Sequence, residues 1–486
     1  MSAQLADREE VVLLSDVHLN EVIATPHDGW WEYKSRHTAD VQDQELADML
    51  GSIDQRRPAW FVRSVIVFNG DTFDFDNCFS GPDGQRIPTE GLPPTVASSV
   101  WKMRRLLSDH HAVVIALARF LARGNRAIFV MGNHDRELHF PEVQEVLRSV
   151  VASAAPVGAG ERVARAIAFE PWFVYRPGVL YAEHGNQYDA TCSYRDVLDP
   201  SVPPTDEDAP AGPSEVTRDE IELETPFGSL LGRHTLSRLG TFNPYNDESF
   251  ILSLGGYFTH WRRYYFPRRP FFRAYFAATF RGLRELVGRR RRQVKSGRVR
   301  PDPQSARWRR YAAKKGVAPG FLERQLRLTS VPIVDRMRLL LHEVWLDRFA
   351  FLLLAVALLV VGIMLVEHWY QAALLGLLLP VFAFVMRAMG RGSLALQERA
   401  RWGLVAESIA EALRVPVVAF GHSHRPERRP LTQGGRYYNL GSWAPVLASD
   451  RESTLARARR YLIVRADASG RVHVAFERWG GEPDSP

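Results

Sequence analysis

Five short apolar runs recur along this 486-residue chain, and each ends in a turn that carries carboxylate, amide or imidazole side chains. Apolar runs of this length, bounded by turn residues, are typical of buried β-strands. The five runs are residues 11–15, 63–68, 127–131, 178–182 and 415–420. The repeated pattern restricts the chain to folds that bring several strand ends to one place.

The segments between these strands predict helices. Apolar residues at helical spacing occur over 41–50 and over 99–123. Strands that alternate with helices indicate sheets with helices packed on them, of the α/β or α+β class. Three later runs, 436–440, 461–465 and 472–476, predict a closing set of antiparallel strands. Ligands of such folds bind beyond the carboxyl ends of the strands, so we expect the polar turns to form one site.

A long interval of different composition separates the fourth strand from the fifth. Residues 196–400 begin with an acidic, proline-rich stretch that predicts a surface loop. An Arg-rich segment follows, with 19 Lys or Arg and two acids between Arg262 and Lys315, in a chain of net charge +7. We therefore expect a domain in two parts, 1–195 and 401–486, interrupted by this insertion. Its positive segment predicts a polyanionic partner, either anionic lipid or nucleic acid.

The insertion also contains two apolar runs, 349–366 and 372–386, joined by five residues. The first is long enough to span a bilayer, and the short connection predicts an antiparallel hairpin over 349–386. Arginines flank its base and aromatic residues lie in its connection, namely Arg348, Arg387, Arg391, Trp369 and Tyr370. This distribution predicts a membrane hairpin whose base faces the cytoplasm. The alternative is a helix pair buried in a helical subdomain or a dimer interface.

Cysteine usage and the first residues bear on the compartment. Two cysteines, Cys78 and Cys192, lie far apart in sequence, which indicates a reducing compartment rather than a disulfide framework. The first residues do not place a basic region before an apolar one, so we expect no cleaved signal. These features predict a cytoplasmic catalytic domain held at a cell membrane.

The polar turns together supply carboxylates, an amide and imidazoles, which suit a metal centre. Mixed oxygen and imidazole ligands favour ions such as Mn²⁺, Fe²⁺ or Zn²⁺ over a thiolate site. Two ions that lie close together need a ligand that reaches both, and a carboxylate does this well. Each motif is a weak signal alone, because histidines and Gly-Asp pairs are common in turns. The combination of all five is the informative feature.

The five motifs resemble, in order and placement, those of the calcineurin-like metallophosphoesterase superfamily. The superfamily pattern is DxH, GDxxD, GNH(D/E), an isolated His and GHxH. The matching residues are Asp16, His18, Gly70, Asp71, Asp74, Gly132, Asn133, His134, Asp135, His184, Gly421, His422 and His424. The resemblance covers about residues 10–190 and 410–480. It implies a β-sandwich flanked by helices, into which the helical region with the membrane hairpin is inserted.

The resemblance also implies two divalent metal ions, Mn²⁺ first, with Fe²⁺, Zn²⁺ and Mg²⁺ as alternatives. One ion is assigned to Asp16, His18, Asp71 and His424. The other is assigned to Asp71, Asn133, His184 and His422. Asp71 would therefore bridge the two ions. Asp74 is expected to orient its neighbours rather than to bind metal.

Further residues receive roles by the same resemblance. His134 would donate a hydrogen bond or a proton toward the leaving group of a phosphoester, with Asp135 holding its ring in place. Arg136 and Arg425 lie beside the motifs and are candidate phosphate contacts. The implied activity is hydrolysis of a phosphate ester or pyrophosphate at the cytoplasmic membrane surface.

The motif style is nearest to the UDP-2,3-diacylglucosamine pyrophosphatase branch, which implies a bacterial inner membrane. The chain differs from that branch in its greater length and in His134, where an arginine is expected. Expected partners are therefore a phosphorylated or pyrophosphate-containing small molecule or lipid, and anionic membrane lipid. Two alternatives stay open. One is a nuclease or phosphodiesterase that binds nucleic acid through the Arg-rich segment, which the adjacent hairpin disfavours. The other is a non-catalytic membrane scaffold that retains a metal site.

Overall fold

A computed structural model of the chain describes most of the regions that the sequence predicts to be ordered. Apart from a few isolated positions between 262 and 376, the described residues are 8–23, 34–84, 91–202, 221–239, 301–343, 346–365, 378–391, 394–445 and 459–480. Both cysteines, Cys78 and Cys192, are buried, and neither forms a disulfide.

Strands from both ends of the chain share the first of two large sheets. Its strands are β1 (Glu9–Leu14), β2 (Arg63–Asn69), β3 (Arg126–Val130), β4 (Ile167–Glu170), β12 (Arg460–Ala466) and β13 (Val472–Arg478). Their order is β13-β12-β1-β2-β3-β4. The first four strands run parallel, and β12 pairs antiparallel with β1. Because β1 is buried along its whole length, its apolar residues form a continuous run instead of alternating with polar ones.

The second sheet is built around the strand that follows the insertion. Its strands are β5 (Phe173–Arg176), β6 (Leu180–Glu183), β9 (Val417–Phe420), β10 (Pro426–Pro430) and β11 (Arg436–Leu440). Their order is β10-β11-β9-β6-β5, and β9 runs parallel to both of its neighbours. A separate two-stranded ladder joins β7 (Ser201–Val202) to β8 (Glu222–Leu223).

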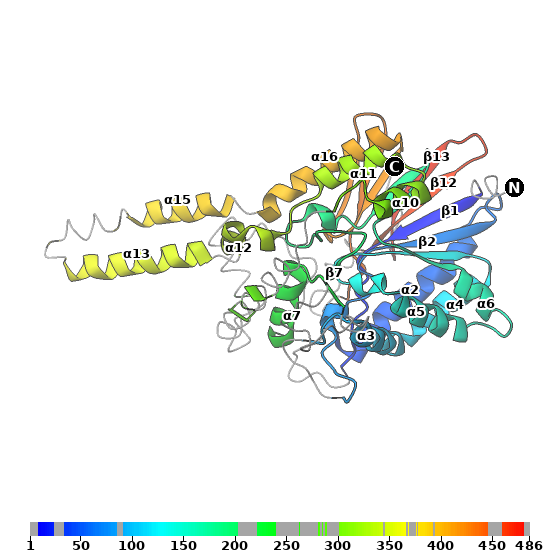
Figure 1. The fold of residues 1–486 in the computed structure, drawn as a ribbon, viewed down its shortest axis with the longest axis horizontal. Helices are drawn as coiled ribbons and strands as arrows, with labels where there is room; N and C mark the ends of the chain where they lie inside the picture. The colour runs from blue at the N-terminus through cyan, green and yellow to red at the C-terminus, as the bar shows by residue number, and fades with distance from the viewer. Residues whose placement is uncertain are drawn as a thin grey trace.

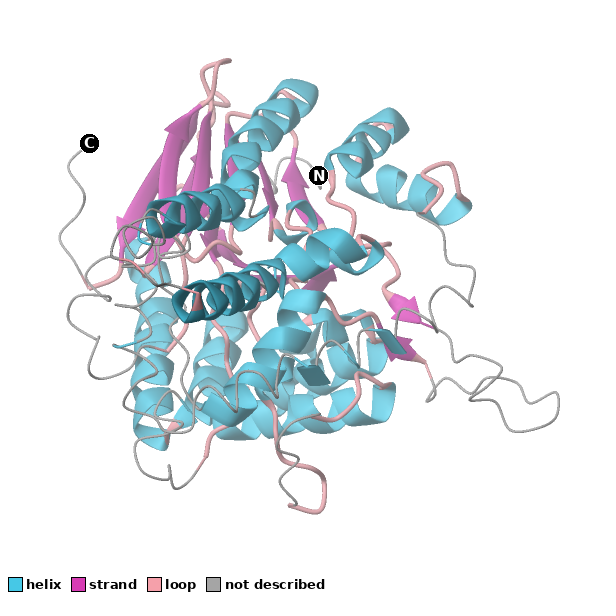
Figure 2. Cartoon of the chain, turned by 90° about the vertical axis from the view of Figure 1, so that its left-hand side faces the viewer, coloured by secondary structure: helices cyan, strands magenta, loops and turns pink. Residues whose placement is uncertain are grey.

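The two sheets pack through an apolar core, and helices lie on both sides of the strands (Figure 1). Val11 and Leu13 of β1 face this core, together with Val417 of β9. The alternate residues Val12 and Leu14 face the helices on the outer side, as the two-residue period of a strand requires. Figure 2 shows the same layering from a second direction. The structure is thus a mixed α/β fold with sheets flanked by helices, which confirms the predicted class at this level.

Two sets of helices cover the sheets. On the first sheet lie α2 (Arg36–Arg56), α3 (Val96–Asp109), α4 (His111–Ala122), α5 (Pro141–Ser153) and α6 (Gly160–Arg165). On the second lie α10 (Ala306–Lys315), α11 (Pro319–Leu328) and α16 (Leu394–Leu413). The segment 99–123 is helical, as predicted, but it contains parts of two helices, because α3 and α4 meet at His110. The buried ring of His110 bonds to Asp43 Oδ1 and to the Asn20 carbonyl, at 2.6 and 2.8 Å.

The closing strands also differ from the prediction in one respect. β12 and β13 are antiparallel, as expected, but β11 runs parallel to β9. The reason is that β10, which the sequence did not predict, supplies the antiparallel partner of β11.

Described parts of the insertion pack near the carboxyl ends of the strands. Helix α7 (Phe227–Leu239) lies against η2 (Phe75–Asn77), which directly follows the second motif. Nearby are η7 (Ile333–Asp335) and α12 (Met337–Glu343). Ala190, Ile333 and Leu340 belong to one small apolar cluster that joins these elements.

Two apolar helices project from this region away from the sheets (Figure 1). α13 (Leu346–Met364) and α15 (Leu378–Arg391) lie side by side, and the rings of Phe351 and Phe382 stack at 5.4 Å. Among the described residues, α13 alone is long and apolar enough to cross a membrane, with mean hydropathy 2.4 and 6% of its apolar window buried. The described residues therefore leave most of this helix exposed. Its insertion into a membrane stays a prediction, and most of 262–300 and of the connection 366–377 lies outside the described residues.

Candidate metal centre

The residues that follow β1, β2, β3, β6 and β9 meet at one edge of the two sheets. Backbone hydrogen bonds join the turns to one another. The Asp16 amide donates to the Gly70 carbonyl at 3.1 Å, and the Gly421 amide donates to the His184 carbonyl at 2.9 Å. The Asn69 side chain donates to the Glu183 carbonyl at 2.7 Å and so connects the two sheets. The predicted convergence of strand ends is therefore observed.

One group of side chains contains Asp16, His18 and His424, whose ligand atoms lie within 4.8 Å of one another. His424 Nε2 lies 3.1 Å from Asp16 Oδ1 and 3.2 Å from His18 Nε2. Asp16 and His18 are buried, and the His424 ring is 16% exposed. The group can therefore be reached from outside on the His424 side.

A second group contains Asp71, His184 and His422, again with ligand atoms within 4.8 Å. His184 Nε2 lies 3.1 Å from Asp71 Oδ2. The same oxygen lies 3.9 Å from His18 Nε2 of the first group. Asp71 thus stands between the two groups, and the bridging role that the resemblance implies for it stays a prediction.

Unsatisfied polar atoms in the centre fit cation binding. Within the described part of the chain, Asn133 Oδ1 is buried and makes no hydrogen bond, and His184 Nε2 is buried beside the Asp71 carboxylate, at 3.1 Å. Buried polar atoms are rarely left without a partner unless a water or an ion completes the site. His184 Nδ1 donates to the Asn69 carbonyl at 3.1 Å, which leaves Nε2 as the nitrogen that could bind an ion. These buried His/Asp groups could hold metal ions.

The backbone of the centre is strained. Six described non-glycine residues have a positive φ, and five of them are predicted ligands, namely Asp16, His18, Asp71, His422 and His424. Such conformations cost about 1–3 kcal/mol each and cluster at functional sites. Gly132 is needed for a different reason, because a Cβ there would collide with the Asp71 carboxylate.

Burial and neighbouring charges shift the pKa values of the side chains in the centre. Burial would raise the pKa of Asp71, but His184 and His134 hold it well below its usual value. Burial lowers the pKa of His18, which keeps this imidazole neutral. Burial opposes protonation of His184 as well, yet Asp71 and Asp16 raise its pKa to about 9. Ionised carboxylates and a neutral imidazole are the forms that bind metal, and the raised pKa of His184 reports a site that attracts positive charge.

The partner of His134 differs from the prediction. Asp135 does not hold the His134 ring, because its two oxygens accept the Gly132 and Thr72 amides at 2.7 and 2.8 Å. Asp135 instead holds together the turns that follow β2 and β3. His134 Nδ1 lies 3.1 Å from Asp74 Oδ1. Burial would lower the pKa of His134, but Asp74 and Asp71 raise it to about 10, so the ring is an imidazolium at neutral pH.

The two arginines predicted to contact phosphate have different surroundings. Arg136 is buried, and its guanidinium donates to both oxygens of Asp76 at 2.8 and 3.0 Å and to the Asn133 carbonyl at 2.9 Å. It is thus turned to the protein interior and not presented to a substrate. Arg425 is partly exposed beside His424, and its phosphate contact stays a prediction.

The insertion contributes residues that the sequence did not predict. From α7, Arg233 donates to Asp76 Oδ1 at 2.9 Å. Ser229 Oγ lies 3.5 Å from Asn133 Nδ2. No sequence signal marks these residues, since they follow no motif and belong to the inserted segment. The inserted segment therefore forms part of the wall of the centre.

A third unpredicted residue, Asp189, lies five positions after His184. Its Oδ2 lies 2.9 Å from His422 Nε2. Burial would raise the pKa of Asp189, but His422 and Thr191 hold it at about 2. The sequence feature that could have identified Asp189 is an acidic residue five positions after a histidine at the end of a strand. Asp189, Cys192 and His422 also form a group whose ligand atoms lie within 4.8 Å.

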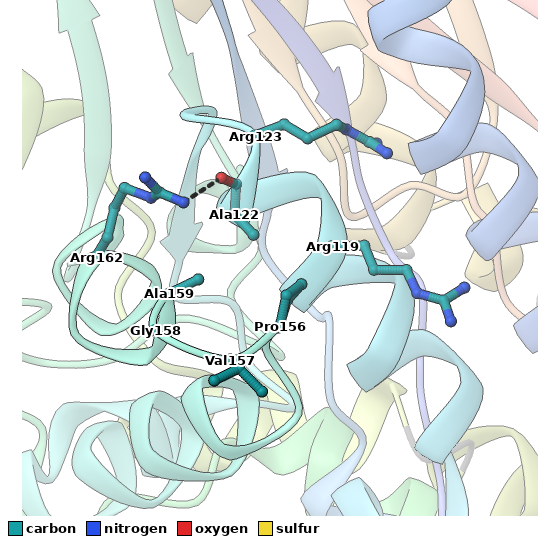
Figure 3. Close-up of a pocket in the computed structure, with 8 residues that line it drawn as sticks. All are labelled: Arg119, Ala122, Arg123, Pro156, Val157, Gly158, Ala159 and Arg162. Carbon is teal, nitrogen blue, oxygen red and sulfur yellow. Dashed lines mark hydrogen bonds between the residues drawn. The ribbon is translucent and has the colours of Figure 1, made fainter.

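A separate hollow of about 450 Å³ lies between the end of α4 and the turn before α6 (Figure 3). Arg119, Arg123 and Arg162 line it. Arg162 donates to the Ala122 carbonyl at 2.7 Å, and Arg123 pairs with Asp54. The hollow shares no residue with the candidate metal centre and adds nothing to its chemistry.

No protein-family model matches the chain, and a search of curated proteins finds no match. The evidence for function is therefore the geometry of the centre: several buried His/Asp groups, brought together from five strand ends, that could hold metal ions.

Proposed function

We propose that the protein is a dinuclear-metal phosphoesterase that hydrolyses a phosphate ester or a pyrophosphate. The observation that carries this proposal is the position of Asp71 Oδ2, 3.1 Å from His184 Nε2 and 3.9 Å from His18 Nε2. A bridging ligand requires a carboxylate that lies close to both groups of histidines, and Asp71 Oδ2 meets this requirement.

The donor set fits the two ions. The first ion would be held by Asp16, His18, Asp71 and His424, and the second by Asp71, Asn133, His184 and His422. All of these donors are oxygen or imidazole nitrogen, which favours Mn²⁺, with Fe²⁺, Zn²⁺ or Mg²⁺ as alternatives. When bound, such ions supply Lewis acidity toward the phosphoryl group and a nucleophilic water at neutral pH.

The chain's own residues would then orient the substrate and move a proton. Asp74 accepts the hydrogen bond from His134 Nδ1, which leaves Nε2 free to donate a proton to the leaving-group oxygen. The raised pKa of His134 keeps that proton in place at neutral pH. Arg425 is the candidate contact for a phosphoryl oxygen at the exposed side of the centre.

Removal of divalent ions tests the proposal. Protein dialysed against a chelator is expected to lose hydrolysis of an aryl phosphate and of an aryl phosphodiester, because the ions would supply the Lewis acidity and the nucleophilic water. Added Mn²⁺ should restore activity up to a stoichiometry of two ions per chain, measured by activity and by elemental analysis of the same samples. A chain that binds no divalent ion, or one that is equally active after chelation, would contradict the proposal; the first result fits only a scaffold.

We further propose that the enzyme works at the cytoplasmic surface of a membrane, with anionic lipid as a partner. Exposed apolar side chains along α13 support this, among them Leu354, Leu358 and Ile363, at 56, 59 and 60% exposure. Arg387 is exposed at the base of the helix pair, where it can approach lipid phosphates. A lipid or pyrophosphate-containing substrate at that surface fits this location.

Polar substitution on α13 tests the location. In Leu358→Glu/Val361→Glu, two exposed positions of the apolar surface gain charge, and a charge in the hydrocarbon core costs about 2.5–3.5 kcal/mol. Most of the variant should move from the membrane fraction to the soluble fraction. Its rate of hydrolysis of a soluble aryl phosphate should stay within about twofold of wild type, a change in activation free energy well below 1 kcal/mol. Leu404→Glu on α16 is the matched control, since Leu404 is 71% exposed outside the hairpin. Release of the wild-type protein by a high-salt wash alone would show that the hairpin does not insert.

A further inference from the structure

Asp189 is placed to control one candidate ligand. It directly follows η4 (Asn186–Tyr188), the short turn that comes after His184. Its Oδ2 lies 2.9 Å from His422 Nε2. The same short segment therefore supplies one ligand of the second group, His184, and the hydrogen-bond partner of another.

The carboxylate of Asp189 is itself held in place. Its other oxygen, Oδ1, accepts hydrogen bonds from the Thr191 amide and from Thr191 Oγ1, at 2.7 and 2.6 Å. Its side chain is 18% exposed, and the His422 ring is 10% exposed. Since Oδ1 is occupied by Thr191, Oδ2 is the oxygen directed at His422.

The His422 ring is also confined by its neighbours. The Trp402 ring lies 5.9 Å from it, and the His184 ring lies 5.2 Å from it, both edge to face. With the ring confined, the bond to Asp189 decides which nitrogen carries the proton. A carboxylate that accepts the Nε2 proton leaves the Nδ1 lone pair available to a metal ion.

We propose that Asp189 is a positioning residue that fixes the tautomer and orientation of His422, so that His422 binds the second ion through Nδ1. This inference rests on the proposed dinuclear centre. Outer carboxylates of this kind make the ligand more basic, and their loss costs about 10–100-fold in metal affinity.

The insertion contributes to this arrangement. The Ala190 carbonyl, next to Asp189, accepts the Ile333 amide at 2.7 Å. Ala190 and Ile333 pack in one apolar cluster with Leu340 of α12, which precedes α13. The position of Asp189 is therefore set by the segment that leads into the apolar helix pair, and not by the two sheets alone.

Asp189→Asn tests the inference, because asparagine keeps the size of the side chain and removes its charge. Metal-free protein is titrated with Mn²⁺, bound ions are counted, and electron paramagnetic resonance separates coupled ion pairs from isolated ions. Wild type is expected to bind two ions with a spin-coupled spectrum. Asp189→Asn should lose about 10–100-fold in affinity for one ion only, and the six-line spectrum of isolated Mn²⁺ should appear at intermediate concentrations.

The matched control is Asp467→Asn. Asp467 Oδ2 also lies 2.9 Å from a histidine nitrogen, that of His473, but this pair is exposed and contains no candidate ligand. The control should titrate as wild type does. Thermal melting of the metal-free variants within a few degrees of wild type would show that all of them fold.

Three outcomes would overturn the inference. An Asp189→Asn protein that binds two coupled ions with wild-type affinity would refute the positioning role while leaving the proposed function intact. Three ions in wild type and two in the variant would make Asp189 a ligand, together with Cys192, of a separate ion. A wild-type protein that binds no Mn²⁺ would overturn the proposed function, and this inference with it.

Discussion

Replacing Asp71 with asparagine is expected to reduce Mn²⁺-dependent hydrolysis by at least about 10³-fold, equivalent to about 4 kcal/mol of lost transition-state stabilisation. Asp71 Oδ2 faces both histidine groups, and Oδ1 accepts the His134 amide at 2.8 Å. An asparagine can satisfy only one of these roles. With its amide nitrogen at the Oδ2 position the bridging ligand is lost, and in the flipped orientation the amide opposes the His134 N–H. The measurement is kcat on an aryl phosphate at saturating Mn²⁺, with bound ions counted in parallel.

A buried aspartate outside the centre is the control for Asp71. Asp109 accepts the Val22 amide at 2.9 Å and pairs with Arg105, and it belongs to none of the candidate groups. Asp109→Asn should lose some stability but keep its activity and its two ions. Wild-type activity in Asp71→Asn would contradict the dinuclear mechanism, whereas equal losses in both variants would point to general unfolding.

His134→Gln is expected to lower kcat by about 10²–10⁴-fold while both ions stay bound. The reason is that His134 offers a proton from Nε2 and is not one of the predicted ligands. The loss should be largest for an alkyl phosphate, whose leaving group needs a proton, and much smaller for a nitrophenyl phosphate, whose leaving group does not. The measurement is kcat on both substrates, with ion content determined on the same protein.

The control for His134 is His473→Gln, which removes an exposed histidine that is also paired with an aspartate. It should change neither substrate's kcat. If His134→Gln reduced hydrolysis of both substrates equally and lost an ion, His134 would be a ligand or a structural residue rather than a proton donor.

The sequence predicted the strands that carry the centre because each is a buried apolar run. Val65 and Val67 of β2 face the core between the sheets, whereas Ile66 and Phe68 face the helices, so both faces of this strand must be apolar. β10 was missed because it has the opposite character. Its sequence is PERRP, it is mostly exposed, and it is an edge strand held by its ladder with β11. β4 and β5 are short and partly exposed, so their sequences do not form a clear buried apolar run.

The candidate ligands could be proposed from the sequence because they lie just after predicted strands, and the ends of neighbouring strands must meet. Residues that orient the ligands were not predictable in this way. Asp76 pairs with Arg136 and Arg233, which lie 60 and 157 residues away, and no local pattern encodes such distances. The pairing of Asp135 with backbone amides instead of with His134 likewise depends on how two turns pack, which the motif alone does not specify.

The separation of the ligands along the chain has a consequence for the order of synthesis. His18 and His424 are 406 positions apart, so the first group cannot exist until almost the whole chain has been made. At about 5–20 residues per second, α13 and α15 leave the ribosome some seconds before β9 and its two histidines do. If the protein has the proposed function, a nascent chain would expose its apolar helices before it could bind a pair of ions. Attachment to a membrane would precede activity, and a chain that stops before β9 would be anchored but inert.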